Sequence, residues 1–431
     1  MRKIILITIS LIFFIPKVFA VTLSEALTQA YKNNPELNAE RENIKVSEED
    51  LNISKGDYLP TLTLSGSKSK EDTNKLTNQS GGDASITDVD PLSTSITIEQ
   101  TLIDFGRNAE HDKNIIGISL AKAKLLKKEQ DILYKAIEAY TGLILANEKF
   151  EINQANVSLL ERQVETDSIR LERGQVTLSD VAQSESSLAE AQAKVIQAQN
   201  EVLTSKLNYE NIIGPLSNSN LLEKNSTINF VMPADLSSAI ELSKKNNPDL
   251  NIAILEYEQS KKDTIIAKSD LSPTAKLSFE RSYSDDLSST YDEREKDILK
   301  ATVSWPFYSG GKNRAKYKKN RNLQTRKRLL LDNTTKSNEI IVASAWSNFE
   351  TSKSLLNSVE LQVSAAEIAN EGITAEYESG VGRTTLEVIQ SNSFLLNAQI
   401  SLANSQRNYL LSQFNLLKSI GLLNSDYLKI K

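Results

Sequence analysis

The sequence predicts a mainly helical chain in which very long antiparallel helices, spaced like a coiled coil, accompany a small β part. Three observations predict this fold class. Two stretches, 107–173 and 312–379, contain no proline and space their apolar residues three and four apart. Four shorter stretches alternate apolar with polar residues, as strands with one apolar face do. The whole pattern also occurs twice along the 431 residues, so one unit is repeated.

The N-terminus has the pattern of a secretory signal peptide. Arg2 and Lys3 precede an apolar run over residues 4–15, and Val18-Phe19-Ala20 places small residues at positions −3 and −1 of a cleavage site. We therefore expect residues 1–20 to be a signal peptide and the mature chain to begin near Val21. The apolar run is shorter than the roughly 20 residues that a membrane-spanning helix needs. The sequence predicts an exported protein without a transmembrane helix.

The repeat defines the domain organisation that we expect. Asn33–Leu37 (NNPEL) recurs as Asn246–Leu250 (NNPDL), and Gly174 corresponds to Gly380. The predicted segments are a first repeat over 21–214, a linker over 215–233, a second repeat over 234–421 and a short C-terminal tail over 422–431.

Each repeat begins with two helices and a hairpin. The first helix ends at Asn-Asn-Pro, where proline suits the first turn of the next helix. The period of the apolar residues then changes from 3.6 to 2, which indicates strands. The expected helices are 23–32 and 36–55 in the first repeat and 236–245 and 249–268 in the second. The expected hairpins span about 60–104 and 274–308, with polar loops over 68–94 and 285–297.

A long helical pair completes each repeat, over about 107–212 and 312–420. At 1.5 Å per residue, its first helix would be on the order of 100 Å long. Its return helix would cover 178–209 in the first repeat and 386–417 in the second. Both return helices open on a sequence that fits a capping box, Thr177 with Asp180 and Thr384 with Glu387, in which a hydroxyl and a carboxylate bond free amides.

Composition excludes most catalytic chemistry. The chain has no cysteine and one histidine, His111, so thiolate chemistry is excluded and a histidine triad would have to use that residue. A net charge of −6 does not suggest nucleic-acid binding. We expect no enzymatic activity, no cofactor and no metal site.

Four amphipathic strands cannot close a membrane barrel, because the smallest such barrels have about eight strands. If the strands lie in lipid, several chains have to share one barrel, since open sheet edges are not tolerated there. Trp305 and Phe307 would then belong to an interfacial aromatic girdle. A soluble sandwich is the alternative interpretation of the same strands.

The ordered set of motifs resembles the TolC-like outer-membrane efflux proteins over essentially the whole mature chain. The resemblance rests on the tandem repeat, the two Asn-Asn-Pro starts, the strand exits at Asp104–Arg107 and Tyr308–Gly311, and the turns Gly174–Val181 and Gly380–Val388. It implies a homotrimer whose twelve strands form one outer-membrane barrel in contact with lipid. It also implies an α-barrel tunnel in the periplasm that meets a periplasmic adaptor protein and an inner-membrane pump.

The resemblance also implies roles for six residues at the turns. It places the gating residues of the family on Arg383, Tyr377 and Asp180, with Ser179 beside them, and an Arg383–Asp180 pair between coils as a latch. It places the cation-selective ring on Glu387 and Gln390. Gln390 is neutral where the family is commonly acidic, and the turn before Arg383 is one residue longer than usual.

Each of these residues also has a purely structural interpretation. Asp180 and Glu387 can act only as helix caps, Arg383 can be a solvated turn charge, and Tyr377 can fill the helical seam. We interpret the chain as a passive exit duct of a multi-component export system, serving drug efflux or type I secretion. The alternative is a structural coiled-coil envelope or surface protein without a channel.

Overall fold

The computed structural model describes residues 20–75, 85–216, 222–224, 230–288, 291–380 and 382–430. The signal peptide predicted for residues 1–20 lies outside them except for Ala20, as does part of the predicted linker. The chain divides into two compact units. One unit, here called the core unit, contains residues 1–38, 128–246 and 340–431, and the other, the sheet unit, contains residues 39–127 and 247–339.

Short helices precede each sheet segment, as the sequence predicts. Thr22 caps the first of them with a reciprocal capping box, and the side chain of Asn247 accepts the amides of Asp249 and Leu250 at the start of another. Proline stands at the first position of the helices that follow both Asn-Asn-Pro motifs. The helices are α1 (Leu23–Asn33), α2 (Pro35–Gly56), α5 (Leu236–Asn246) and α6 (Pro248–Ser269).

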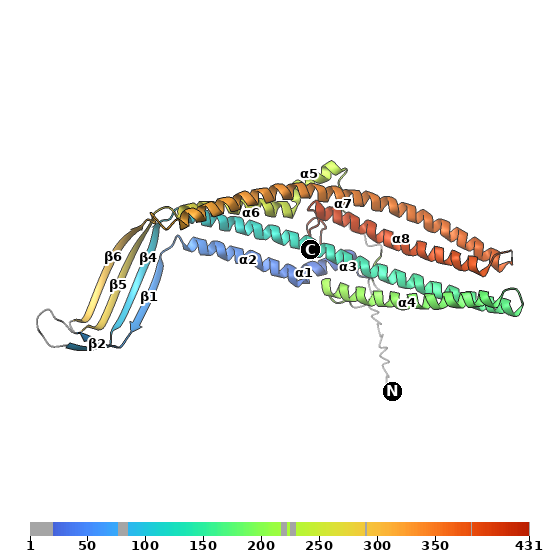
Figure 1. Ribbon diagram of the computed structural model, residues 1–431, viewed down its shortest axis with the longest axis horizontal. Coiled ribbons are helices and arrows are strands. Elements are labelled where there is room, and N and C mark those ends of the chain that lie inside the picture. The colour runs from blue at the N-terminus through green and yellow to red at the C-terminus, as the bar shows by residue number, and fades with distance from the viewer. Residues whose placement is uncertain are drawn as a thin grey trace, which may run out of the picture. The chain divides into compact units, whose positions relative to one another are not determined.

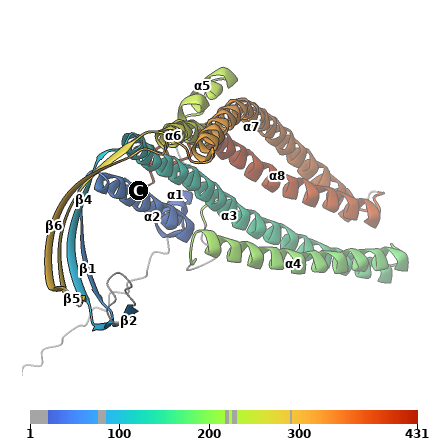
Figure 2. The same cartoon turned by 60° about the vertical axis from the view of Figure 1, so that its left-hand side comes forward.

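Two very long helices confirm the main prediction. Helix α3 (Arg107–Glu172) has 66 residues and α7 (Lys312–Glu378) has 67, so each is on the order of 100 Å long. Each is followed by a return helix of 35 residues, α4 (Leu178–Ile212) or α8 (Thr385–Ser419). Figures 1 and 2 show α4 beside α3 and α8 beside α7.

The sheet unit carries one antiparallel sheet of four strands in the order β1-β4-β5-β6. Its strands are β1 (Thr61–Lys68), β4 (Leu92–Ile103), β5 (Thr274–Ser288) and β6 (Tyr291–Ser304). The two predicted hairpins therefore pair with each other through β4 and β5, and β1 and β6 are the edges (Figure 1). A small second sheet pairs β2 (Glu71–Lys75) with β3 (Ser85–Val89).

The predicted loops at the ends of the hairpins were too long. Residues 285–297 belong almost entirely to β5 and β6, and the predicted loop over 68–94 contains β2 and β3. The physical reason is that strands are held by backbone hydrogen bonds, which polar residues form as well as apolar ones. Residues 76–84 and 289–290 lie outside the described part of the chain.

One face of the sheet is apolar across all four strands. Leu62 pairs with Ile98, Ile98 with Phe279, and Phe279 with Leu299. Leu299 is 73% exposed, so the chain leaves this row uncovered. On the alternating positions Lys276 forms a 2.8 Å ion pair with Glu99. Beyond β6, the exposed rings of Trp305 and Phe307 meet edge to face with centroids 5.8 Å apart.

The hydrophobic core lies in the core unit. Its largest buried side chains come from α3, α4 and α8, among them Tyr140, Tyr209 and Phe414. The hydroxyl of Tyr140 donates to the carbonyls of Val21 and Glu223 at 2.8 and 2.9 Å, and burial raises its pKa. The predicted C-terminal tail packs into this core through Leu423, Leu428 and Ile430. Among the described residues, no helix combines the length and apolar character that crossing a bilayer requires.

Candidate functional site at the helical tip

Two turns reverse the chain at the ends of the long helices, and we call them the tip turns. The first joins α3 to α4 and the second joins α7 to α8. Gly174 has a φ of 68° and Gly380 a φ of 79°, in the left-handed region where a side chain would be strained. Each glycine thus ends a long helix, and the chain can reverse within a few residues.

Capping boxes hold the start of both return helices, as the sequence predicts. The amide and hydroxyl of Thr177 donate to the carboxylate of Asp180 at 2.8 and 2.7 Å, and the amide of Asp180 donates back at 3.3 Å. Thr384 and Glu387 repeat this arrangement, with 2.8 Å from the amide of Thr384 to Glu387. The amide and hydroxyl of Thr177 lower the pKa of Asp180, so this carboxylate stays ionised as a cap.

Tyr377 is the centre of a buried polar cluster on the last turn of α7. Its side chain is 3% exposed. The hydroxyl donates to Asp167 of α3 and lies 3.0 Å from the hydroxyl of Thr385 on α8. Burial, reinforced by the Asp167 carboxylate, raises the pKa of Tyr377. The hydroxyl is therefore protonated at neutral pH and joins three helices.

Arg170 covers the same tyrosine from α3. Its guanidinium lies 4.1 Å from the centre of the Tyr377 ring, within cation–π range. It also donates to the backbone carbonyls of Tyr377 and Glu378 at 2.8 and 3.2 Å. Both carbonyls lie in the last turn of α7, and that of Tyr377 also accepts from the amide of Gly380 at 3.1 Å, so the cation fixes the helix end to α3.

Asp167 and Arg170 were not predicted as site residues. Asp167 is fully buried and accepts a second hydrogen bond, 2.9 Å from Gln163. The signal was in the sequence, because Leu160, Val164 and Leu171 form an apolar seam and Asp167 occupies the seam position between the last two. A carboxylate there is expensive to bury unless a donor meets it.

The predicted Arg383–Asp180 pair is not formed within the chain. Arg383 instead donates to Glu376 at 2.6 Å and to Glu387 at 3.1 Å. Glu376 lies on α7 and Glu387 on α8, so the guanidinium links the two helices across the second tip turn. These bonds raise the pKa of Arg383 and keep the cation engaged.

The remaining predicted residues lie on the surface of the tip. Ser179 and Gln390 are exposed, and Glu387 is half-buried. The amide of Thr384 and then Arg383 lower the pKa of Glu387, which therefore carries a negative charge at neutral pH. The structure thus brings Tyr377, Arg383 and Glu387 into one turn region and holds Asp180 in the other. The site therefore consists of charged side chains that hold the ends of α7 and α8 in place.

A family model provides the deciding comparison. The model of the outer membrane efflux proteins matches residues 26–215 and 239–422. The chain belongs to the outer membrane efflux protein family. As a member, it is located in the outer membrane, with its long helices forming a periplasmic tunnel.

Curated relatives match along almost the whole chain. The outer membrane efflux protein BepC of Brucella suis is 25% identical over 416 residues, covering 95% of this chain and 87% of that protein. The alkaline protease secretion protein AprF of Pseudomonas aeruginosa is 22% identical and covers 96% and 87%. TolC of Escherichia coli is 24% identical and covers 98% and 86%.

Solved structures show the same fold. The outer-membrane channel OprN superposes with a TM-score of 0.80 at 17% identity, covering 93% of this chain and 89% of that one. VceC of Vibrio cholerae gives 0.78 at 18% identity and covers 93% and 96%. The predicted fold class is confirmed, including the long helical pairs and the four strands.

Proposed function

We propose that three copies of this chain form one passive exit duct, with a shared twelve-stranded barrel in the outer membrane and a helical tunnel in the periplasm. The observation that carries the proposal is the sheet. Its apolar row from Leu62 to Leu299 is uncovered, and its edge strands β1 and β6 lack a neighbour among the described residues. Lipid requires both a covered backbone edge and an apolar face, and a closed ring of copies supplies the first.

The duct would work with other proteins. AprF is named for the secretion of a protease and BepC for efflux, and these names support a place in a multi-component export system. We propose that a periplasmic adaptor protein and an inner-membrane pump deliver cargo to the helical end. The energy would come from the pump.

We propose that the tip turns are the gate. Closure of α7 and α8 against α3 would be held by Tyr377 and Arg170, and the second tip turn would be stiffened by Arg383. Asp180, with Ser179 beside it, would face a neighbouring copy across the pore and accept Arg383 from it when the tip rearranges.

Replacing Arg383 tests the gate. We predict that Arg383→Ser raises single-channel conductance in planar bilayers, because both ion pairs of the second tip turn are lost. Arg162→Ser is the matched control, since this exposed arginine lies on α3 near the tip and, among the described residues, its side chain bonds the carbonyl of Ser158 in its own helix. Equal conductance in wild type and Arg383→Ser would contradict the role.

Glu387 would make the mouth cation-selective, helped by the polar Gln390 one turn later. We predict that Glu387→Gln reduces the preference for cations, measured as the reversal potential across a salt gradient. Gln390→Glu should increase it, because the ring then gains a second charge. Unchanged reversal potentials in both variants would refute the assignment.

The oligomer itself is tested by gel mobility. We predict a band in outer-membrane fractions that runs as a trimer unheated and as a monomer after boiling. A chain that fractionates as a periplasmic monomer would contradict the duct and favour the structural coiled-coil interpretation.

A further inference from the structure

Charge alternates from helix to helix in the sheet unit. Helix α2 has six acidic and three basic residues, and α6 has four acidic and three basic. The residues of α3 within the sheet unit, 107–127, include five basic and two acidic ones. The first seventeen residues of α7 contain nine Lys and Arg and no Asp or Glu. Helix α2 connects to β1, α3 to β4, α6 to β5 and α7 to β6, which is the order of the strands in the sheet. Across the sheet the net charges of the helices are therefore negative, positive, negative and positive.

Ion pairs join every neighbouring pair of these helices within the chain. Glu36 of α2 pairs with Lys128 of α3 at 2.6 Å. Helices α3 and α6 are joined by Lys113–Asp263 at 3.1 Å and Lys262–Asp112 at 2.8 Å. The start of α7 is joined to α6 by Lys327–Glu256 at 2.6 Å, and Lys316 pairs at 2.6 Å with Asp270 just after α6.

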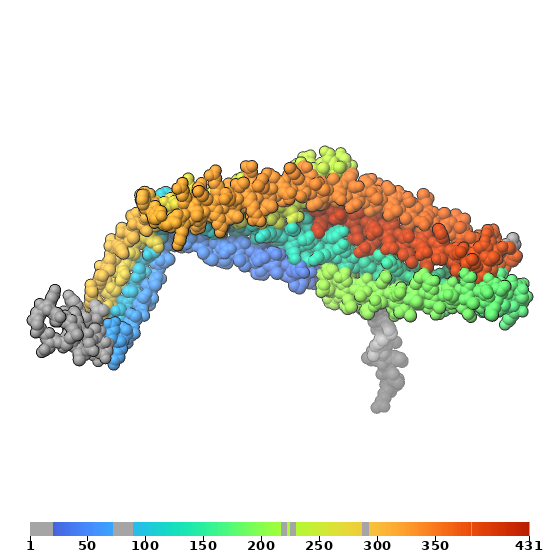
Figure 3. Space-filling model, viewed as in Figure 1, coloured from blue at the N-terminus to red at the C-terminus, as the bar shows by residue number. Residues whose placement is uncertain are grey.

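The outer flank of α7 has no such partner. Lys319 and Arg326 are exposed and have no ion pair among the described residues. Figure 3 shows the first part of α7, in orange, open on the surface. The two residues are seven apart, so they lie on one face of the helix two turns from each other.

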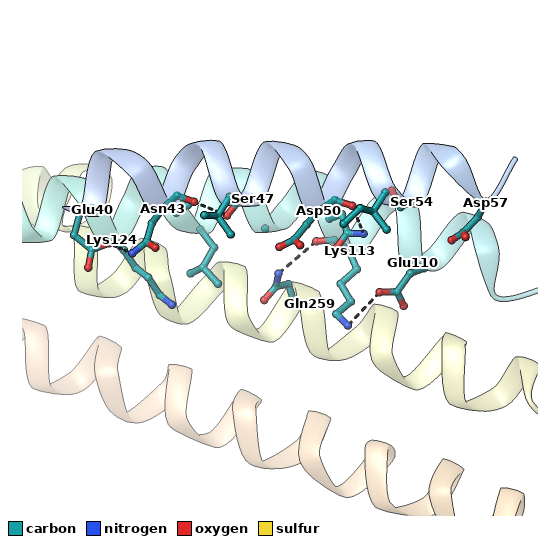
Figure 4. A pocket seen from close by; sticks show the side chains of 16 residues that line it. Glu40, Asn43, Ser47, Asp50, Ser54, Asp57, Glu110, Lys113, Lys124 and Gln259 are labelled. Carbon is teal, nitrogen blue, oxygen red and sulfur yellow. Dashed lines mark hydrogen bonds and ion pairs between the residues drawn. The ribbon is translucent and has the colours of Figure 1, made fainter. Parts of the chain in front are cut away.

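The outer flank of α2 has the opposite charge. Figure 4 shows Glu40, Asp50 and Asp57 lining a groove of about 720 Å³ between α2 and α3. Glu42 and Glu49 do not line it and are exposed to solvent. Within α2, Glu42 pairs with the exposed Lys45 at 2.8 Å and Glu49 accepts from Asn52 at 3.2 Å. Glu42 and Glu49 too are seven residues apart and share one face.

The two flanks belong to the two edges of the sheet. Helix α2 leads into edge strand β1, and α7 follows edge strand β6. When β6 of one copy pairs with β1 of the next, α2 of the next copy lies beside α7. Glu49 and Lys319 are each seven residues from the sheet end of their helices, and Glu42 and Arg326 are each fourteen. The carboxylates and cations therefore have the same spacing along their helices, counted from the ends that lead to the sheet.

We propose that Lys319 and Arg326 of one copy bind Glu49 and Glu42 of a second copy of this chain, closing the alternating ring of charged helices below the barrel. This inference rests on the proposed sharing of one barrel between copies, and it adds the surface that fixes their register. The occupant is a second copy because its charges have the opposite sign and the same spacing, and because its helix leads into the edge strand that β6 would pair with.

Disulfide trapping tests the proposal directly, because the chain has no cysteine of its own. In the full-length protein, the double variants Glu49→Cys with Lys319→Cys and Glu42→Cys with Arg326→Cys should form covalent dimers and trimers on mild oxidation. The control pairs Glu49→Cys with Arg321→Cys, where Arg321 is a basic residue on a different face of the same helix segment. It should remain monomeric on a denaturing gel.

Charge reversal provides a second readout. Glu49→Lys and Lys319→Glu should each lower the temperature at which the trimer dissociates, by about 1 °C for each kcal/mol lost per chain, and the combined reversal should restore it. A trimer that forms but shows no cross-link and no shift would overturn this inference and leave the proposed duct intact. Absence of any trimer would overturn both. Reduced binding of Lys319→Glu to phosphatidylglycerol vesicles, with an unchanged trimer, would assign the cations to lipid and overturn the inference.

Discussion

At the scale of single residues, the tip depends on one buried hydroxyl. Tyr377 meets the carboxylate of Asp167 and the guanidinium of Arg170, both on α3, and the hydroxyl of Thr385 on α8. A buried carboxylate that loses a donor is left partly unsatisfied, which costs on the order of 2 kcal/mol. Phenylalanine at position 377 keeps the ring and loses the hydroxyl. It would therefore weaken the closure of the tip without leaving a cavity.

We predict that Tyr377→Phe raises channel conductance and lowers the unfolding temperature. Tyr427→Phe is the matched control, because its hydroxyl donates at 2.7 Å to the carbonyl of Val231 away from the tip. It should leave conductance unchanged. If both variants conduct like wild type in bilayer recordings, the hydrogen bond from Tyr377 to Asp167 does not hold the tip closed.

The caps should respond to acid. The pKa of Glu387 is lowered in the folded chain, so its contribution to stability is present above the unfolded pKa of about 4.3 and is lost as pH falls through the lower folded value. We predict that the difference in unfolding temperature between wild type and Glu387→Gln is constant near neutral pH, shrinks as the pH falls below the unfolded pKa of about 4.3, and disappears below the lower folded pKa. A difference that persists in acid would contradict the capping role.

At the scale of elements, the sequence predicted the helices closely because their signals are local. Proline at a first turn, glycine after a last turn and a capping box each act within a few residues, and α3 and α7 end one residue before the predicted positions. The strand ends were less predictable, because β5 and β6 continue through polar residues that pair only by backbone bonds.

The glycines of the tip turns give an element-scale prediction. Gly380→Ala should destabilise the second tip turn by about 1 kcal/mol, because the left-handed φ of 79° strains any side chain. Gly372→Ala is a control that should shift stability in the opposite direction. This glycine lies inside α7, and an added Cβ would have open space around it. Alanine there should raise stability by a similar amount. Thermal unfolding followed by circular dichroism measures both.

The site was only partly predictable. The sequence identified the capping carboxylates because their spacing is fixed by one helical turn. It did not identify Asp167 as the partner of Tyr377, because that contact joins positions 210 residues apart. The expected Arg383–Asp180 pair does not form within one chain, where Glu376 and Glu387 bind the guanidinium, and between copies it stays a prediction.

At the scale of the whole molecule, the chain is a fraction of a closed object. In the described part of the chain, its sheet has two open edges and an uncovered apolar face, and Lys319 and Arg326 on the outer flank of α7 have no ion pair. The proposed ring of copies would satisfy all three features together. The central proposal is therefore that the working unit is a gated, water-filled assembly.

Single-channel recording of the purified assembly in planar bilayers tests that claim most directly. The account predicts discrete conductance steps that are small in the wild type and larger in Tyr377→Phe, because the buried cluster at the tip limits the opening. Purified trimers that insert into the bilayer and give no steps in either protein would contradict it.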